Sequence, residues 1–294
     1  MTDQVTRNNH YVPQWYQRGF IESGRSQLHY LDMSLPHKVL PDGRTVPIKA
    51  LHKWGPTSCF SEYDLYSTHF GSVVNDEVEK FLFGSIDDRG SKAVRAFADG
   101  DLSAMHYAFQ DFFEYLDAQK LRTPKGLDWI KSRYSSLDQV QLMVEMQGLR
   151  FIHCTMWTEG VREIVSAEAS DIKFIVSDHP VTVYNAATPP TSTECAYPED
   201  PPIEWLGAQT VFALDANTCL ILTHLEYAKD PKAANSTAPR TYARYRGQSL
   251  VRTDAFIRTR KLSRNEVIAI NHLLKSRARR YVAASDKEWL YPEK

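Results

Sequence analysis

Segment 8–20, NNHYVPQWYQRGF, places a histidine and an arginine among aromatic rings and one proline. Pro13 fixes its own φ and favours an extended residue before it, so an extended stretch should lead into a short helix that ends at Gly19. An imidazole can act as a general base, and a guanidinium can hold an anion. His10 and Arg18 are therefore either fixed polar groups of a pocket or hydrogen-bonded members of a packed N-terminal plug.

Two carboxylates lie on one expected helix. Asn75 is a good N-cap, and apolar residues follow it at helical spacing. Glu79 and Asp87 are eight residues apart, which separates them by roughly 80° around the helix axis, so both can reach one side. They form either a pair of pocket carboxylates, suited to proton transfer or to a hard metal ion, or part of a solvated helix face.

A second polar pair closes the next expected helix, over about 103–121. Gln119 and Arg122 are three residues apart, so their side chains are neighbours, and a proline soon after them stops the helix. A long helical stretch is expected over 136–166. His153 lies among apolar neighbours there and is expected to be a core histidine.

The pattern then changes from helical to strand-like. Residues 173–177 and 181–184 are rich in β-forming types, and a sharp bend between them presents Ser177, Asp178 and His179. An acid and a histidine at the end of a rigid strand are well fixed for catalysis. The alternative is an Asx turn, in which Asp178 bonds only its own backbone.

The remaining patterns indicate an α+β fold. Further strands are expected at 27–31, 45–48, 209–214 and 218–223, the first two as a hairpin. Long polar loops are expected at 186–202 and 228–247, and a capping box of Ser263 and Glu266 begins the last helix. We therefore expect a mainly helical first half, antiparallel strands in the second half and a closing C-terminal helix.

Composition restricts the compartment and the partners. No apolar run approaches a membrane span, the first residues are polar, and the cysteines are scattered, so we expect a reduced, cytoplasmic protein. Segment 229–282 carries fourteen Lys and Arg against three acids, a net charge of +11, while the rest of the chain carries −12. This asymmetry suggests either a polyanionic partner, such as a nucleic acid or nucleotide, or a basic face docked on an acidic one.

Several short motifs together resemble an uncharacterised family, domain of unknown function 4238. Its members open with a pattern similar to HYVPxFYLRxF, and 10–20 reads HYVPQWYQRGF, with Gln17 in place of the usual leucine. The later matching positions are Val78, Glu79, Ile86, Asp87, Gln119, Arg122, Thr123, Pro124, Phe174, Ser177, Asp178, Pro180, Val181, Arg280, Tyr281 and Val282. The resemblance covers nearly the whole chain and implies one domain, 1–294, but the family carries no established activity.

The resemblance also groups the polar residues. The matching polar positions are His10, Arg18, Glu79, Asp87, Gln119, Arg122, Ser177 and Asp178. If they converge, they must either pair with one another or form a site, because burying unpaired charges is costly.

Three functions compete for this set. In a metal-dependent phosphodiesterase or nuclease, Glu79, Asp87 and Asp178 would hold Mg²⁺ or Mn²⁺, and Arg18 and Arg122 would stabilise phosphoryl charge. The sequence carries no recognised nuclease signature, however. In the second hypothesis the same arginines clamp a nucleotide or another small anion without a metal. In the third, the set is a buried ion-pair network in a binding protein that is not an enzyme.

Overall fold

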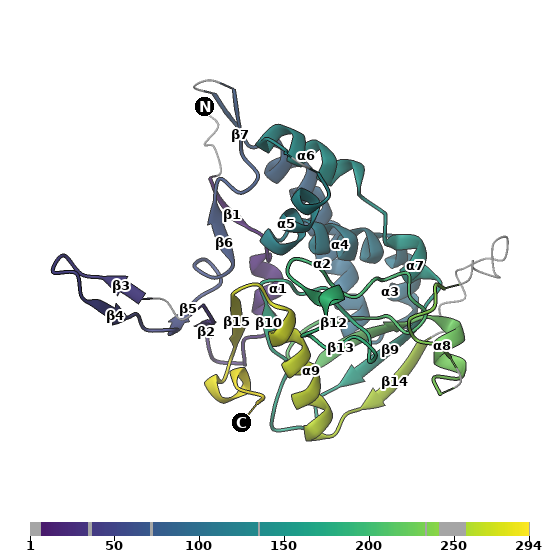
Figure 1. Cartoon of the computed structure of the whole chain (residues 1–294). Helices are drawn as coiled ribbons and strands as arrows, with labels where there is room; N and C mark the ends of the chain where they lie inside the picture. The colour runs from purple at the N-terminus through teal and green to yellow at the C-terminus, as the bar shows by residue number, and fades with distance from the viewer. Residues whose placement is uncertain are drawn as a thin grey trace.

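The computed structural model describes residues 7–34, 37–70, 73–134, 136–232, 234–240 and 257–293. Helices and mainly antiparallel sheets share the fold, which confirms the expected α+β class (Figure 1). Within these ranges no helix is both long and apolar enough to cross a bilayer.

A five-stranded sheet forms one layer of the molecule, in the order β11-β12-β13-β9-β14. Its strands are β9 (Val161–Ser166), β11 (Thr182–Tyr184), β12 (Gln209–Ala213), β13 (Thr218–Thr223) and β14 (Ile257–Lys261). All pairs are antiparallel except β9 with β14. The β12–β13 pair matches the strands expected from the sequence.

A four-stranded sheet joins distant parts of the chain, in the order β10-β15-β2-β5. Its strands are β2 (Leu28–Asp32), β5 (Leu51–Trp54), β10 (Val176–Ser177) and β15 (Tyr281–Ala284). The expected hairpin between 27–31 and 45–48 is therefore wrong, because β2 pairs with β15 and β5. Instead β3 (His37–Val39) pairs with β4 (Thr45–Pro47), and this hairpin projects from the body (Figure 1).

Two short antiparallel strand pairs are formed in the first third of the sequence, and one of them includes the start of the N-terminal motif. β1 (Asn8–His10) pairs with β6 (Ser61–Tyr63), and β7 (Thr68–Phe70) pairs with β8 (Val73–Asn75). The short helix expected after Pro13 is present as α1 (Gln14–Arg18).

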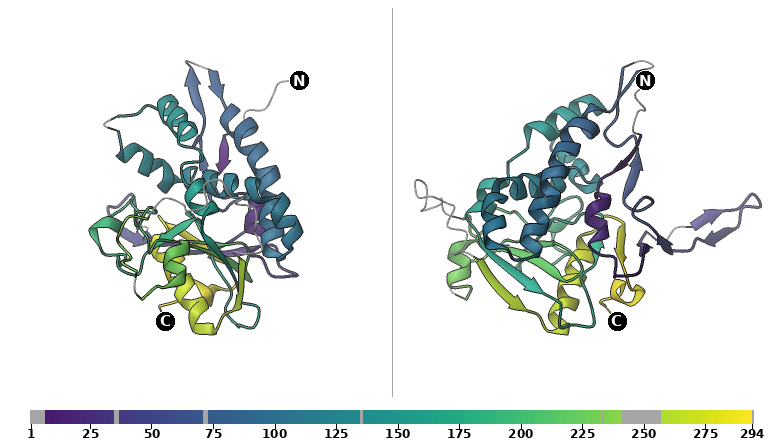
Figure 2. Two further views of the ribbon diagram at one scale, coloured as in Figure 1. Left: turned by 90° about the vertical axis from the view of Figure 1, so that its right-hand side faces the viewer. Right: turned by 180° about the vertical axis from the view of Figure 1, so that it is seen from behind.

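The helical layer packs on the five-stranded sheet, as the turned views show (Figure 2). A π-helix, η1 (Val78–Phe83), runs into α2 (Gly84–Ala98). The remaining helices of the layer are α3 (Leu102–Tyr107), α4 (Phe109–Leu121), α5 (Pro124–Ser132), α6 (Gln139–Gly148) and α7 (Cys154–Thr158). Most of α4 is buried, and Phe112 and Tyr115 contact Phe212 of the sheet.

The long helix expected over 136–166 is wrong. The chain forms α6 and α7 there and then enters the sheet as β9. Phe151 takes a positive φ of 70° between the two helices, which is incompatible with a continuous helix. The β-branched residues of β9 are placed in the sheet by pairing with β13, a contact that local periodicity does not reveal.

The C-terminal helix, α9 (Arg264–Arg277), begins as expected, with both bonds of the Ser263–Glu266 capping box formed. The other short helices of the second half are α8 (Leu225–Lys229), η2 (Thr193–Cys195) and η4 (Lys287–Leu290). The 186–202 segment is otherwise a loop, and it reaches the end of α4.

Candidate functional site

His10 and Arg18 fit the structural interpretation of the N-terminal motif. Arg18 is exposed and donates from Nη2 to Gln14 Oε1 at 3.3 Å. The His10 ring contacts the Thr57 carbonyl, with Nε2 3.3 Å from the oxygen, and burial lowers its pKa. Among the described residues, neither side chain contacts the acids of the predicted set.

Four of the predicted residues do converge, around the buried guanidinium of Arg122. Its Nη2 lies 2.9 Å from Asp87 Oδ1, and its Nε donates to Gln119 Oε1 at 2.8 Å. Gln119 Nε2 donates to the Tyr11 carbonyl at 2.9 Å, so the cluster ties the N-terminal motif to α4. Glu79 lies close enough to interact electrostatically with both Arg122 and Asp87. These four residues therefore form an ion-pair and hydrogen-bond network.

Glu79 should make the stability of the protein depend on pH near neutrality. Burial raises its pKa to about 7 from 4.5, although Arg122 opposes the shift. The folded state therefore binds this proton more tightly than the unfolded state, and the contribution to stability is lost as pH rises towards 7. We expect Glu79→Gln to exceed the wild type in stability above that pH by up to about 3 kcal/mol.

Urea unfolding at pH 5 and pH 8 measures this effect. The control is Glu77→Gln, on the exposed neighbouring turn, which should leave the pH dependence of the wild type intact. An unchanged pH dependence in Glu79→Gln would show that Glu79 is ionised across this range.

Asp178 has a structural role. Its carboxylate is 2% exposed and accepts backbone N–H groups of Arg279 at 2.8 Å, Arg280 at 2.6 Å and Tyr281 at 2.8 Å. These bonds join β10 to the start of β15 and use both carboxylate oxygens. Ser177 Oγ accepts from the His179 amide at 3.3 Å, within the same bend.

The predicted metal ligands Glu79, Asp87 and Asp178 are not assembled into one site. Over the described ranges, no group of three or more His, Cys, Asp and Glu side chains could hold a metal ion. Asp178 is bound to the backbone of β15, whereas Glu79 and Asp87 face Arg122. A site for Mg²⁺ or Mn²⁺ stays a prediction from the sequence alone.

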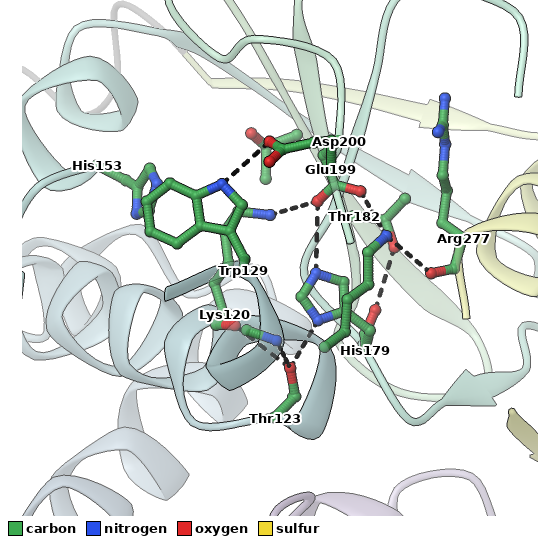
Figure 3. A network of polar contacts seen from close by, with 12 residues as sticks. Lys120, Thr123, Trp129, His153, His179, Thr182, Glu199, Asp200 and Arg277 are labelled. Carbon is green, nitrogen blue, oxygen red and sulfur yellow. Dashed lines mark hydrogen bonds and ion pairs between the residues drawn. The ribbon is translucent and has the colours of Figure 1, made fainter. Parts of the chain in front are cut away.

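His179, presented by the predicted bend, belongs to a second network (Figure 3). Its Nδ1 lies 2.7 Å from Thr123 Oγ1, and its Nε2 lies 3.4 Å from Asp200 Oδ2. The ring is 2% exposed, and burial lowers its pKa to about 3, so the imidazole is neutral. Thr123 is also the N-cap of α5, where its hydroxyl accepts from the Gly126 amide.

Two lysines share the carboxylate of Asp200. Lys120 Nζ is 2.5 Å from Oδ2, and Lys125 Nζ is 2.7 Å from Oδ1. Lys125 also donates to the Arg277 carbonyl at 3.1 Å. Burial opposes ionisation of Asp200, but the two lysines hold its pKa well below the usual range. Burial lowers the pKa of Lys120.

These groups line a cavity of about 310 Å³ between the α4–α5 junction and the 198–204 loop. Its rim carries Trp129, whose Nε1 donates to Glu199 Oε2 at 3.2 Å. Arg133 donates to the same oxygen at 2.7 Å and lies over the Trp129 ring at 5.0 Å. His153, expected in the core, is buried beside the cavity and bonds Asp117, with Nδ1 2.7 Å from Oδ1.

The lysines of this cavity were not identified from the sequence. Lys120 lies in the last turn of α4 and Lys125 in the first turn of α5, so the tight junction between the two helices brings them together. Asp200 follows Lys125 by 75 residues and arrives from the predicted loop. The one local signal was His179, at the bend between the predicted strands.

Gly126 permits the close approach of the two helices. A Cβ atom there would lie 2.3 Å from the Lys120 carbonyl oxygen and 2.4 Å from that of Leu121. We expect Gly126→Ala to lower the free energy of unfolding by about 1–3 kcal/mol, because backbone must move. Gly148→Ala, where nothing lies within 4 Å, is the control and should be neutral or slightly stabilising. Chemical denaturation compares the two, and equal stabilities would contradict the close approach.

No known relative identifies this chain. No family model, no curated protein and no solved structure matches it. The resemblance to domain of unknown function 4238 thus stays a prediction, and a function must be argued from the geometry.

The basic segment 229–282 supplies ion pairs to acids elsewhere in the chain. Arg280 Nη2 lies 2.7 Å from Asp32 Oδ2, and Arg260 Nε lies 2.8 Å from Glu163 Oε1. Arg240, Arg264, Lys275 and Arg279 also pair with acids. For these residues the basic face is docked on acidic partners. Arg244, Arg246 and Arg252 lie outside the described residues, and a nucleic-acid partner stays a prediction.

Proposed function

We propose that the protein binds a small organic anion in the cavity, with a carboxylate or phosphate group held against Lys120 and Lys125. The observation that carries this proposal is the sharing of one buried carboxylate, Asp200, by two lysines in the cavity wall. Arg133 and Glu199 pair with each other, and the exposed Glu204 also lines the cavity. The part of the wall around Asp200, with both lysines charged and His179 neutral, carries one positive charge in excess. A monoanion would neutralise it at little desolvation cost, because the cations are already withdrawn from water.

His179 adds a directed donor to this wall. If Nδ1 accepts from the Thr123 hydroxyl, the ring proton is on Nε2. That nitrogen lies 3.4 Å from Asp200, long for a hydrogen bond, and it has no other partner among the described residues. An anion in the cavity would accept a hydrogen bond from this N–H group, and further hydrogen bonds from the amines of the two lysines.

The size and the remaining walls favour a small ligand with a partly apolar body. The cavity, at about 310 Å³, is at the lower end of the roughly 300–1,000 Å³ typical of ligand pockets. Leu121, Val183, Ile203 and the Trp129 indole supply apolar surface. This proposal keeps the hypothesis of a small anion bound without a metal, but it assigns the cationic contacts to different residues. Arg18 is exposed and Arg122 is already paired with Asp87, so Lys120 and Lys125 take that role.

Anion binding can be tested by calorimetry and thermal shift with pyruvate, lactate, inorganic phosphate and AMP. We expect at least one of these probes to bind, and Lys125→Met to bind it about ten-fold or more weakly, because a charge-assisted hydrogen bond contributes about 1.5–3 kcal/mol. Lys131→Met is the matched control, since Lys131 lies on the same helix with half of its side chain exposed. Equal affinities for wild type and Lys125→Met, or no binding of any probe, would overturn the proposal.

A further inference from the structure

The two lysines of the cavity differ in how their amines are engaged. Lys125 donates both to Asp200 and to the Arg277 carbonyl, so two acceptors hold its amine in place (Figure 3 shows Arg277 and Asp200). The described contact of the Lys120 amine is with Asp200. Lys120 therefore has the freer amine, although it lies in the same buried wall.

Lys120 can lose a proton to water in the cavity, because its side chain is 12% exposed and lines that cavity. The second ammonium group, bound to the other oxygen of Asp200, favours loss of this proton. A buried amine next to another cation is the usual setting in which lysine acts as a nucleophile towards a carbonyl group. Lys120 and Lys125 both line the cavity.

The placement of both amines around one anionic group fits one class of ligand. The two lysines contact the two oxygens of a single carboxylate, that of Asp200. In a 2-oxo acid the acidic group and the carbonyl carbon are adjacent. An acid group held by Lys125 and His179 would thus bring the carbonyl carbon near Lys120.

We propose that the ligand of this cavity is a 2-oxo acid or a similar acidic carbonyl compound, and that Lys120 condenses with its carbonyl group to form an imine. This inference rests on the proposed function, because the anion must first bind. Lys120 gives a proton to water, and the neutral amine attacks the carbonyl carbon. The new C–N bond forms as the carbonyl electron pair moves to oxygen.

The remaining steps balance within the site. A proton passes from nitrogen to the new alkoxide, and the proton released in the first step returns through water to the resulting hydroxyl. The C–O bond breaks, water leaves, and a protonated C=N bond remains on Lys120. The sum is one amine and one carbonyl giving one imine and one water, with no oxidant or reductant.

Borohydride trapping tests this inference on the full chain. Pyruvate or 2-oxoglutarate with borohydride should add the mass of the acid less one oxygen atom, and peptide mapping should place it on Lys120. Lactate has the same acid group but no carbonyl group, so it should give no adduct and should protect the protein against pyruvate. The amount of adduct should fall about ten-fold or more in Lys120→Arg, whereas Lys131→Arg should give as much adduct as the wild type.

The outcomes separate the two proposals. If pyruvate and lactate both bind but borohydride traps no adduct, the imine is wrong and anion binding stands. If neither acid nor any other anion binds, the proposed function itself fails. An adduct spread over many lysines, equally present in urea-unfolded protein, overturns the inference. Protection by lactate uses only wild type, so the test holds even if Lys120→Arg does not fold.

Discussion

Replacing Arg122 by methionine should lower the free energy of unfolding by about 3–5 kcal/mol, because it leaves buried acids without their partner. The Arg122 side chain is 1% exposed, lies 2.9 Å from Asp87, and is flanked by the Phe83 and Tyr115 rings at 5.2 and 5.6 Å. Loss of the guanidinium also removes the donors to Gln119, which positions Tyr11. The N-terminal motif should therefore lose its anchor on α4.

Urea unfolding with two further variants makes this expectation specific. The double variant Arg122→Met with Asp87→Asn should recover part of the loss, because no charged carboxylate at position 87 remains buried. Arg264→Met removes a surface pair in which both side chains are more than half exposed, and it should change stability by less than about 1 kcal/mol. A similarly small effect for Arg122→Met would mean that the cluster contributes little to folding.

Asp178→Ala should be comparably destabilising, by about 3 kcal/mol, since it leaves three partly buried backbone donors without their acceptor. Those donors belong to Arg279, Arg280 and Tyr281, where β15 begins. Asp178→Asn keeps acceptor capacity and should be intermediate in stability.

Asp101→Ala provides the matched comparison for this substitution. Asp101 is exposed and accepts two backbone N–H groups at the start of α3, at 2.9 and 3.0 Å. Its loss should cost about 0.5–2 kcal/mol, the usual range for an N-cap. Thermal and urea unfolding of both variants would show whether the buried carboxylate contributes more to stability than the exposed one. If Asp178→Ala were no worse than Asp101→Ala, its bonds to β15 would not be a major support of the sheet.

Local signals in the sequence predicted the elements whose causes are local. The Ser263–Glu266 capping box and the β12–β13 pair depend on neighbouring residues, and both form. The grouping of Glu79 and Asp87 with Arg122 followed from motif resemblance, and the structure brings them together.

The failures depend on contacts between distant residues. The residues of β9 were assigned to a helix because their pairing with β13, which is distant in the sequence, leaves no local pattern. The cavity was missed because lysines are usually on the surface, and no local spacing links Lys120 or Lys125 to Asp200. Asp178 was assigned to metal binding because an acid at a strand end suits several roles, and only its three amide partners identify its role here.

The pairing of β2 with β15 affects how the chain can reach its native state. Leu31 lies opposite Val282, so a strand near one end of the sequence is completed by a strand near the other. Closing so long a loop has a large entropic cost and slows folding. During synthesis, β2 cannot form this pair until β15 has left the ribosome. Until then its N–H and C=O groups on that edge lack their native partner, so this edge is where chaperone contact or mispairing between nascent chains is most expected.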